Sequence, residues 1–516
     1  MPTQTRPIRF YHRGQVVEVK DVQPTKSVLD WLREDAHCTG TKEGCNEGDC
    51  GACTVVIGEP AARARASGTA SADATVVRGL SLRAVNACIQ LLPTLDGKAL
   101  FTVEDLAGKK GALHPVQQAM VDCHGSQCGF CTPGFVMSMW SCYERHRERG
   151  TTPSRRELAD ELSGNLCRCT GYRPILDAGE RMFELDRARL DTQPVLGALA
   201  AIAPRESFRY AAPHRALPGA PLHEFHAPRT IAELAALVAD RPQARILAGS
   251  TDIGLWVNKM FRELPELIYV GEVDELKRIE ARTDGTLAIG AGATLEDAWV
   301  ALAERHASLR EMGLRFASLP IRNAGTMGGN VANGSPIGDS APVLLALDAR
   351  LVLQQRERVR QMPLADFYVD YMKNRLAPGE FVRAIEVPPA ARGLAVRAYK
   401  ISKRYDCDIS GVATGFSIVL DGERVRDVRL AYGGMAAIVK RAAHAEAALR
   451  GAEWNERGLR AAQAALERDV TPLADMRGGA AYRMQTARNL LERFWLETRP
   501  REALQAEQTS VWKVLA

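Results

Sequence analysis

Long apolar runs are missing from this sequence of 516 residues. No stretch of eighteen consecutive apolar residues occurs, which excludes a hydrophobic helix that spans a membrane. The opening residues, MPTQTRPIRFYHRGQ, contain no apolar stretch of the kind found in signal peptides. These absences predict a cytoplasmic protein with no membrane partner.

The sequence also lacks a strong excess of positive charge, because its net charge is only +5. A surface that binds nucleic acid or an anionic membrane needs clustered basic residues. The insertion 61–74, rich in Ala, Arg and Ser, is more typical of a solvated surface loop. We therefore expect no nucleic-acid partner. No Ser-His-Asp triad and no paired-carboxylate site is identifiable, and we assign no catalytic residue.

Cysteine is almost absent from the last two thirds of the chain, because all the cysteines except Cys407 lie in the first 169 residues. In a reducing compartment twelve cysteines are not expected to form a disulfide framework. Metal binding is the better explanation where the thiols cluster. The length allows two to four domains, of which the first ones carry the thiol chemistry.

The first cysteine cluster is Cys45, Cys50 and Cys53, with the C-x4-C-x2-C spacing of a plant-type 2Fe–2S loop. Three glycines in this loop permit turns that bulkier residues would strain, and they let backbone N–H groups approach sulfur. The fourth thiolate must come from elsewhere, and Cys88 is the nearest candidate. The alternatives are a structural zinc site or buried thiols without metal, but zinc sites favour paired knuckles.

The second cluster pairs Cys128 and Cys131 with Cys167 and Cys169. A C-x2-C motif alone is shared by redox dithiols and zinc sites, whereas its combination with C-x-C is more specific. A helix is predicted to begin just after Cys131, so its N-terminal dipole would favour anionic sulfur. Three other thiols are expected to be packed side chains rather than ligands: Cys38, Cys123 and Cys142.

Local patterns predict the elements that carry these motifs. Residues 8–19 alternate as a hairpin does, and residues 27–34 indicate a short helix. Capping boxes at Ser154 and Thr230 predict helices that end near Gly164 and before Pro242.

A strand at residues 245–248 is predicted to run directly into Gly249-Ser250-Thr251-Asp252, which is typical of a phosphate-binding corner. A second glycine segment, 325–330, differs from the dinucleotide fingerprint G-x-G-x-x-G. We expect both segments to be loops whose free backbone N–H groups hold a pyrophosphate from two sides. Asp252 and Asp339 are candidate acceptors for ribose or ring donors, or else loop caps.

Together these motifs resemble a known family, the molybdenum hydroxylases. The segments EGCNEGDCGACTV, NACIQLL, QCGFCTPGFVMSM and GNLCRCTGYRPI resemble their iron–sulfur portion. The segments RILAGSTDIGL, IRNAGTMGGNVANGSPIGDSAPVLLAL and YGGMA resemble their FAD domain. The similarity extends over nearly the whole chain, and within the family it is nearest to the xanthine dehydrogenases.

The resemblance implies a multidomain α+β fold. A ferredoxin-like β-grasp 2Fe–2S domain is expected over 6–92 and a helical-bundle 2Fe–2S domain over 100–186. A linker would cover 187–222, an α+β FAD-binding domain 223–390, and a smaller C-terminal α+β subdomain 395–500.

The resemblance also implies ligand sets. One 2Fe–2S cluster would be held by Cys45, Cys50, Cys53 and Cys88, and the other by Cys128, Cys131, Cys167 and Cys169. Phe316 is placed near the flavin ring, although it is also explained as plain core. The FAD contacts implied are Ile246, Leu247, Ala248, Gly249, Ser250, Thr251, Asp252, Ile253, Phe316, Thr326, Gly328, Gly329, Asn330, Asp339, Val382 and Lys400. The segment 405–408 falls where the family has a mobile loop near the flavin.

The sequence has no room for the large molybdenum domain of the single-chain relatives, so we expect the electron-transfer subunit of a xanthine dehydrogenase. Its partner would be a molybdopterin-binding large subunit that oxidises hypoxanthine and xanthine to urate, in a dimer of heterodimers. Electrons would pass through both clusters to FAD and then to NAD+. The alternatives are another molybdenum hydroxylase acting on an aldehyde or a heterocycle, oxygen as the acceptor, or a zinc-stabilised scaffold without redox function.

Overall fold

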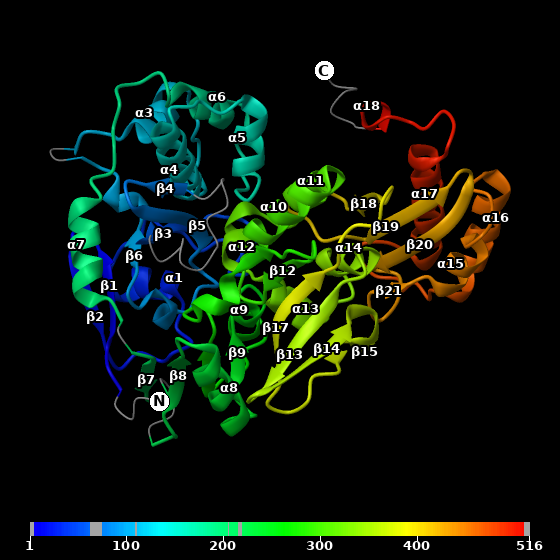
Figure 1. Cartoon of the computed structure of the whole chain (residues 1–516). Coiled ribbons are helices and arrows are strands. Elements are labelled where there is room, and N and C mark those ends of the chain that lie inside the picture. The colour runs from blue at the N-terminus through cyan, green and yellow to red at the C-terminus, as the bar shows by residue number, and fades with distance from the viewer. Residues whose placement is uncertain (1–4, 62–74, 109–110, 205, 215–218, 510–516) are drawn as a thin grey trace.

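A computed structural model describes residues 5–61, 75–108, 111–204, 206–214 and 219–509 of the chain. Four units follow one another in the sequence, from blue through cyan and green to red in Figure 1. The insertion predicted at 61–74 lies, apart from Ala61, outside the described residues.

The first unit is a six-stranded mixed sheet with the order β2-β1-β6-β3-β5-β4. The predicted hairpin is confirmed, because β1 and β2 pair antiparallel and turn at Arg13-Gly14, where both residues have positive φ. Strands β1 and β6 pair in parallel, and the short helix α1 packs beside the sheet. The bounds are β1 Ile8–His12, β2 Gln15–Val19, α1 Val28–Asp30, β3 Thr54–Pro60, β4 Thr75–Val77, β5 Leu80–Asn86 and β6 Ala99–Phe101.

The second unit consists of helices that cover one side of this sheet. The predicted capping box is confirmed, since Ser154 Oγ accepts from Glu157 N while the Glu157 carboxylate accepts from Ser154 N. The helix predicted after Cys131 is confirmed as well, with Cys131 at its N-cap position. The helices are α3 Pro115–Asp122, α4 Thr132–Arg149, α5 Arg155–Leu162 and α6 Arg173–Arg181.

The segment 187–222, expected to be a linker, contains regular structure. Helix α7 (Gln193–Ile202) packs Val195, Leu199 and Ile202 into the core shared by the sheet and the helices. These three apolar residues recur at intervals of four and three, which is the period of one helix face. Strand β7 (Phe208–Ala212) follows and pairs antiparallel with β8 (His223–Ala227). The connection is therefore fastened by packing to the units on both sides.

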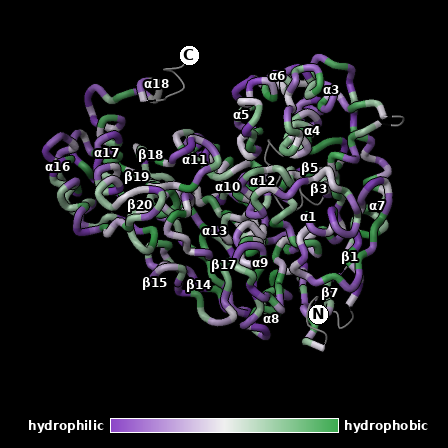
Figure 2. The backbone as a smooth tube through the Cα atoms, turned by 180° about the vertical axis from the view of Figure 1, so that it is seen from behind, coloured by the Kyte–Doolittle hydropathy of each residue, from purple (hydrophilic) through white to green (hydrophobic). Residues whose placement is uncertain are grey.

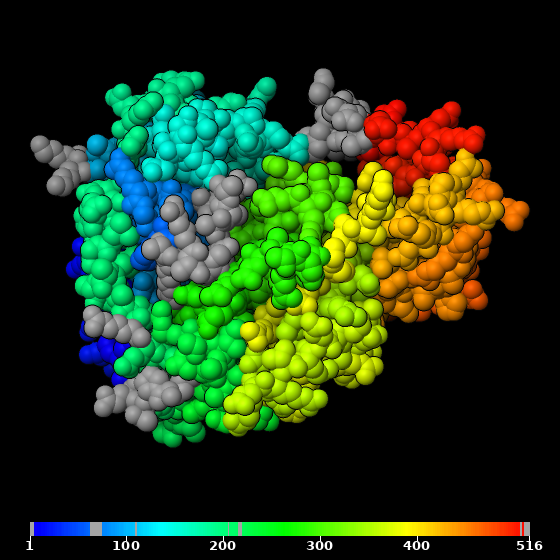
Figure 3. All heavy atoms as spheres, in the orientation of Figure 1, coloured from blue at the N-terminus to red at the C-terminus, as the bar shows by residue number. Residues whose placement is uncertain are grey.

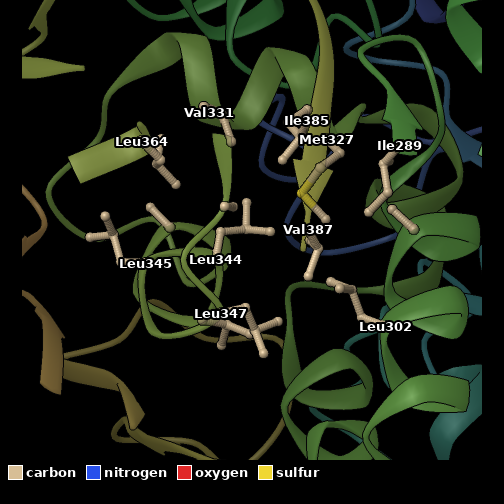
Figure 4. Packing of buried hydrophobic residues seen from close by; sticks show 14 of the residues in the cluster. Ile289, Leu302, Met327, Val331, Leu344, Leu345, Leu347, Leu364, Ile385 and Val387 are labelled. Carbon is tan, nitrogen blue, oxygen red and sulfur yellow. The ribbon is translucent and has the colours of Figure 1, made fainter. Parts of the chain in front are cut away.

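The third unit combines a four-stranded sheet, β7-β8-β10-β9, with a five-stranded sheet, β11-β12-β17-β13-β14. Figure 4 shows its main core, in which Met327 and Val331 from a helix meet Ile385 and Val387 from a strand. The helix predicted after Thr230 is confirmed and ends before Pro242. The strands are β9 Arg245–Leu247, β10 Glu266–Tyr269, β11 Ile279–Ala281, β12 Leu287–Gly290, β13 Arg350–Gln355, β14 Arg358–Pro363, β15 Tyr368–Asp370, β16 Lys373–Asn374 and β17 Phe381–Val387. The helices are α8 Ile231–Asp240, α9 Ile253–Asn258, α10 Leu295–Arg305, α11 Arg310–Arg315, α12 Leu319–Ala324, α13 Met327–Asn333 and α14 Ser340–Ala346.

The fourth unit is a four-stranded antiparallel meander packed on helices, which forms the orange to red lobe of Figure 3. Seen from behind, α9 and α12 lie between the iron–sulfur side of the molecule and this lobe (Figure 2). Within the described ranges, no helix has the length and apolarity needed to cross a bilayer. The elements are β18 Ala395–Ile401, β19 Val412–Asp421, β20 Arg424–Gly433, β21 Lys440–Arg441, α15 Ala443–Leu449, α16 Glu456–Ala465, α17 Ala480–Thr498 and α18 Ala506–Thr509.

Candidate redox site

The four thiols of the first cluster, which we call the inner cluster, lie in two pairs. Backbone N–H groups of Cys45 and Cys50 each point at the other residue's sulfur, at 3.3 Å. The sulfurs of Cys53 and Cys88 are 3.3 Å apart. Hydrogen bonds from the Cys50 thiol and from backbone N–H groups lower the pKa of Cys45 to about 5, so it is readily a thiolate, the form that binds iron.

The pairing of the thiols fits two irons rather than one zinc ion. Thiolates about 2.3 Å from a tetrahedral zinc lie about 3.8 Å from one another, so all four sulfurs would be close together. Among the described residues, no three cysteine sulfurs lie within 4.8 Å of one another. Two separated pairs are what a diiron cluster needs, because each iron takes two of the four thiolates.

The glycines of the inner loop are required by its close packing. A Cβ at Gly44 would lie 2.7 Å from Cys50 Sγ. Gly51 has φ +69°, and a Cβ there would lie 2.2 Å from the Gly164 carbonyl oxygen. The loop therefore has no space for larger residues at these positions, either around the sulfurs or against the helical unit.

The second set of thiols, the outer cluster, is brought together by two segments of the helical unit. Cys128 faces Cys169, and Cys131 faces Cys167. A hydrogen bond from the Phe130 backbone lowers the pKa of Cys128. Burial raises the pKa of the Cys167 thiol, but hydrogen bonds from the Thr170 side chain, from backbone N–H groups and from Cys131 together bring it below its ordinary value. The structure thus gives a second group of four sulfurs in two pairs. They come from two segments of the chain that only folding brings together.

The remaining cysteines lie apart from both sets. Cys38 and Cys142 are buried in hydrophobic clusters, and Cys123 packs partly buried against the helical core. Cys407 is buried, and its sulfur lies 3.7 Å from Asp49 Oδ1 in the inner loop. Segment 405–408, expected near the flavin, therefore also contacts the inner-cluster loop, which sequence reasoning did not predict.

The corner after β9 offers free backbone donors. Within the described residues, the N–H groups of Gly249, Ser250, Thr251 and Asp252 have no hydrogen-bond acceptor. Ser250 has φ +62°, and its buried hydroxyl lacks a partner, as does the buried Oδ1 of Asn330. An unpaired buried hydroxyl is costly, and Ser250 Oγ–H can donate to an anion as the free N–H groups can, so this corner fits a bound anionic group such as a pyrophosphate. Asn330 Oδ1 is an acceptor and would need a donor instead.

The prediction that the second glycine segment is a loop with free backbone N–H groups was wrong. Residues 327–333 form helix α13, and the N–H groups of its first residues are already bonded within the protein: Met327 to Ala293 O, Gly328 to Ala291 O, Gly329 to Thr326 Oγ and Asn330 to Thr326 O. The N-cap Thr326 takes the donor that a free loop would offer to a ligand.

The glycines here serve packing between segments. A Cβ at Gly249 would lie 1.9 Å from Ala324 O, and one at Gly328 would lie 2.4 Å from Ala291 Cβ.

The other predicted FAD contacts are distributed between a polar pair and the core. Lys400 Nζ lies 2.6 Å from Asp339 Oδ2, and Ser410 donates to Asp339 Oδ1 at 2.5 Å, all three being buried. Asp339 is thus held by protein groups on both oxygens. Phe316 and Val382 are members of the hydrophobic core of the third unit, with Phe316 5.9 Å from Trp299 between ring centroids.

Three regions far apart in the sequence meet at the inner loop. Asn258 at the end of α9 donates to Cys88 O at 2.7 Å, and Gln90 donates to Gly249 O at 3.2 Å. On the other side, Asn165 donates to Gly51 O at 3.0 Å, and Leu166 N, beside Cys167, donates to Cys50 O at 2.9 Å. The segments that carry the inner thiols are therefore bonded to α9 and to the corner after β9 on one side, and to the residues just before Cys167 on the other.

Four domain families match the chain in this order. They are the 2Fe-2S iron-sulfur cluster binding domain at 10–90, the 2Fe-2S binding domain at 102–180, the FAD binding domain in molybdopterin dehydrogenase at 221–390, and the CO dehydrogenase flavoprotein C-terminal domain at 397–498. The matches agree with the multidomain α+β fold described above.

Curated relatives include two kinds of enzyme. The chain is 31% identical to the xanthine dehydrogenase of Emericella nidulans over 95% of its own length and 38% of the relative's. It is 30% identical to aldehyde oxidase 2 of Macaca fascicularis over 95% of its own length and 39% of the relative's. The chain thus spans under two fifths of these relatives.

Solved structures match about half of the chain. Carbon monoxide dehydrogenase from Hydrogenophaga pseudoflava, in a form lacking the Mo-pyranopterin moiety, aligns with 28% identity and a TM-score of 0.50 over 52% of this chain and 94% of that one. Quinoline 2-oxidoreductase from Pseudomonas putida 86 shares the fold at 23% identity, with a TM-score of 0.50 over 54% of this chain and 98% of that one.

Two 2Fe–2S domains followed by an FAD domain make this chain an iron–sulfur flavoprotein, an oxidoreductase module for electron transfer. It belongs to the molybdenum hydroxylase family.

Proposed function

We propose that the chain is the electron-transfer subunit of a xanthine dehydrogenase. The observation that carries the proposal is the position of the inner cluster: Cys50 O accepts from the residue beside Cys167, and Cys88 O accepts from helix α9. From this arrangement we infer that electrons pass from the outer cluster to the inner cluster and then to the flavin.

The protein's own part in this function is to position and enclose its redox groups. When bound, the clusters supply one-electron transfer, and FAD supplies the change between one-electron and two-electron transfer. Cys53 and Cys88 are 2% and 1% exposed, whereas Cys45 and Cys50 are partly exposed, so the protein shields one pair of inner thiols from water. The free N–H groups at 249–252 with Ser250 would hold the FAD pyrophosphate, and α13 packs against this corner to support it.

The partner and the substrates are part of the same proposal. A molybdopterin-binding large subunit would oxidise hypoxanthine and xanthine, and NAD+ would take the electrons from the flavin, in a cytoplasmic dimer of heterodimers. The match to a xanthine dehydrogenase over 95% of this chain supports this choice. An aldehyde as substrate is the second candidate, because an aldehyde oxidase matches over the same share of the chain at 30% identity.

The acceptor can be tested on the chain alone. The cluster- and FAD-loaded protein is titrated anaerobically with NADH, and we expect the flavin absorbance to bleach first and both cluster signals to follow. NADPH serves as the cofactor control, and the Cys142→Ala variant, which alters a buried thiol outside both clusters, as the protein control. A flavin that dithionite reduces and NADH leaves oxidised would reject NAD+ as the acceptor.

The substrate is tested with the partner present. The complex is purified from the native source through a tag on this chain, and its reduction by xanthine and by an aromatic aldehyde is compared. Xanthine is expected to reduce the clusters at least ten times faster. A faster reaction with the aldehyde, or the absence of a molybdenum-containing chain from the complex, would contradict the proposal.

A further inference from the structure

Two histidines and a glutamate meet at the loop end of the β7–β8 hairpin, outside the redox site. His214 Nε2 lies 3.3 Å from Glu263 Oε1, and His223 Nε2 lies 3.8 Å from Glu263 Oε2. One ligand atom from each of the three residues lies within 4.8 Å of the other two. The two imidazole rings meet edge to face, with centroids 5.3 Å apart.

We propose that His214, His223 and Glu263 form a binding site for a divalent transition metal ion, with Zn²⁺ as the best fit. Imidazole nitrogen and carboxylate oxygen are ligands that zinc accepts, at about 2.0–2.1 Å. Two such ligands on a tetrahedral ion lie about 3.3 Å apart, and the distances to Glu263 are 3.3 and 3.8 Å. The Glu263 side chain is 63% exposed, which leaves the fourth position open to water.

The ring of His223 is held from behind by a residue of the first unit. Its Nδ1 lies 3.3 Å from the side-chain amide nitrogen of Gln23. Turning that amide over places its oxygen at the same point, where it accepts from Nδ1–H and leaves the Nε2 lone pair for the metal. His223 is 6% exposed, so its ring orientation is set by packing and by this contact.

A neighbouring triad shows why this one is suited to a cation. Glu224, His226 and Glu266 also bring three ligand atoms within 4.8 Å of one another. Arginines neutralise those carboxylates, however: Arg209 pairs with Glu224 at 2.9 Å, and Arg241 pairs with Glu266. The two ion pairs that Glu263 makes with described residues are both with imidazoles. A dication would be repelled by the arginines beside Glu224 and Glu266, whereas Glu263 would attract it.

The metal would fasten three segments. His214 follows β7 in the connection between units, His223 begins β8, and Glu263 lies between the flavin-corner helix α9 and β10. Gln23 adds the first unit. The site would therefore hold the connection against both the iron–sulfur part and the flavin part, as a structural rather than a catalytic centre.

The test measures zinc binding to the full chain loaded with iron and FAD, so that the cluster thiols are occupied. Equilibrium dialysis against Zn²⁺ is expected to show one zinc bound per wild-type chain. Glu263→Gln should bind zinc at this site with an affinity at least about tenfold lower. The exposed position of Glu263 makes this variant safe for folding. Glu266→Gln, in the arginine-paired triad, is the matched control and should bind zinc as the wild type does.

A second readout separates a structural metal from loose surface binding. Zinc should raise the thermal unfolding midpoint of the wild type and of Glu266→Gln but not of Glu263→Gln, because only a site formed in the folded chain stabilises it. Gln23→Leu should weaken zinc binding about tenfold without abolishing it. Equal zinc binding by the wild type and Glu263→Gln, or an equal loss in Glu266→Gln, would overturn the proposal.

Discussion

The two cysteine sites use the same two-by-two set of thiols in opposite surroundings. In the inner cluster Cys53 and Cys88 are buried and the other two thiols are partly exposed, and the loop contacts α4 and α9. In the outer cluster Cys128 and Cys169 are exposed. Phe130 and Tyr172, large apolar side chains beside those thiols, are 47% and 40% exposed. The inner site is thus built as a relay within the protein, and the outer site as a contact point with the outside.

The largest difference between the two clusters is expected when one ligand thiol is removed from each. Cys88→Ala is expected to lower bound iron from about four to about two atoms per chain and to stop NADH from reducing the outer cluster, because the intermediate relay is lost. Cys169→Ala should lose a similar amount of iron but leave the inner cluster reducible. Iron analysis and electron paramagnetic resonance of the NADH-treated proteins measure both effects. If Cys88→Ala still transmits electrons to the outer cluster, the order of the relay is wrong.

Replacement of a glycine by alanine should destabilise the protein more in the inner loop than in the outer loop. Gly51→Ala places a Cβ 2.2 Å from Gly164 O at φ +69°, so both the backbone and the contact between units are strained. We expect a loss of about 3–5 kcal/mol in the free energy of unfolding. Gly129→Ala in the outer loop has φ +81° and nothing within 4 Å of the added Cβ, and should cost only about 1–2 kcal/mol. Denaturant unfolding of the two holoproteins checks the difference, and similar costs would show that the inner loop relaxes freely.

The helical unit of the outer site should respond to pH through a buried carboxyl group. Burial raises the pKa of Glu144 on α4 to about 7, above its ordinary value of 4.5. The folded chain therefore keeps a proton that the unfolded chain releases, and this stability is full below about pH 4.5 and is lost as pH rises towards 7.

Glu144→Gln removes this dependence. It should stabilise the protein by about 1–3 kcal/mol at pH 8 and by less than about 1 kcal/mol at pH 5. Thermal unfolding at the two pH values measures the gain. The exposed Glu148→Gln on the same helix is the control, and a gain that is equal at both pH values would argue against titration of Glu144.

The smallest expected effect is at the contact between the inner loop and helix α9. Asn258→Ala removes hydrogen bonds to Cys88 O at 2.7 Å and to Asn46 Oδ1 at 3.1 Å, and should cost about 1–2 kcal/mol. Gln118→Ala, which removes an exposed bond to Asp122 on α3, should cost less than about 0.5 kcal/mol. Stopped-flow mixing with NADH should show slower reduction of the inner cluster in Asn258→Ala alone. Unchanged kinetics would mean that this contact has no part in the relay.

Much of the local structure was predictable because its causes are local. The hairpin at 8–19, the capped helix after Ser154 and the strand before Gly249 depend on residues a few positions apart. The sequence did not predict helix α7 because Pro194 and Pro204 suggested an irregular segment and because only three of its residues form the apolar face. Helix α13 was taken for a loop because its glycines suggested free backbone, although Thr326 was already a helix-cap residue in the sequence.

The sequence alone determined which residues have the chemistry: seven cysteines at diagnostic spacings, Cys88 as the nearest candidate for the eighth, and a strand that ends in a glycine corner. Only the tertiary structure decided which of them are buried and which touch. Asn165, Gln90 and Asn258 connect the three redox regions, yet each is an ordinary amide in the sequence, with its partner 114, 159 and 170 positions away. A ligand spacing within one loop is limited by the reach of a few residues, whereas contacts at such separations exist only after hydrophobic packing has brought the units together.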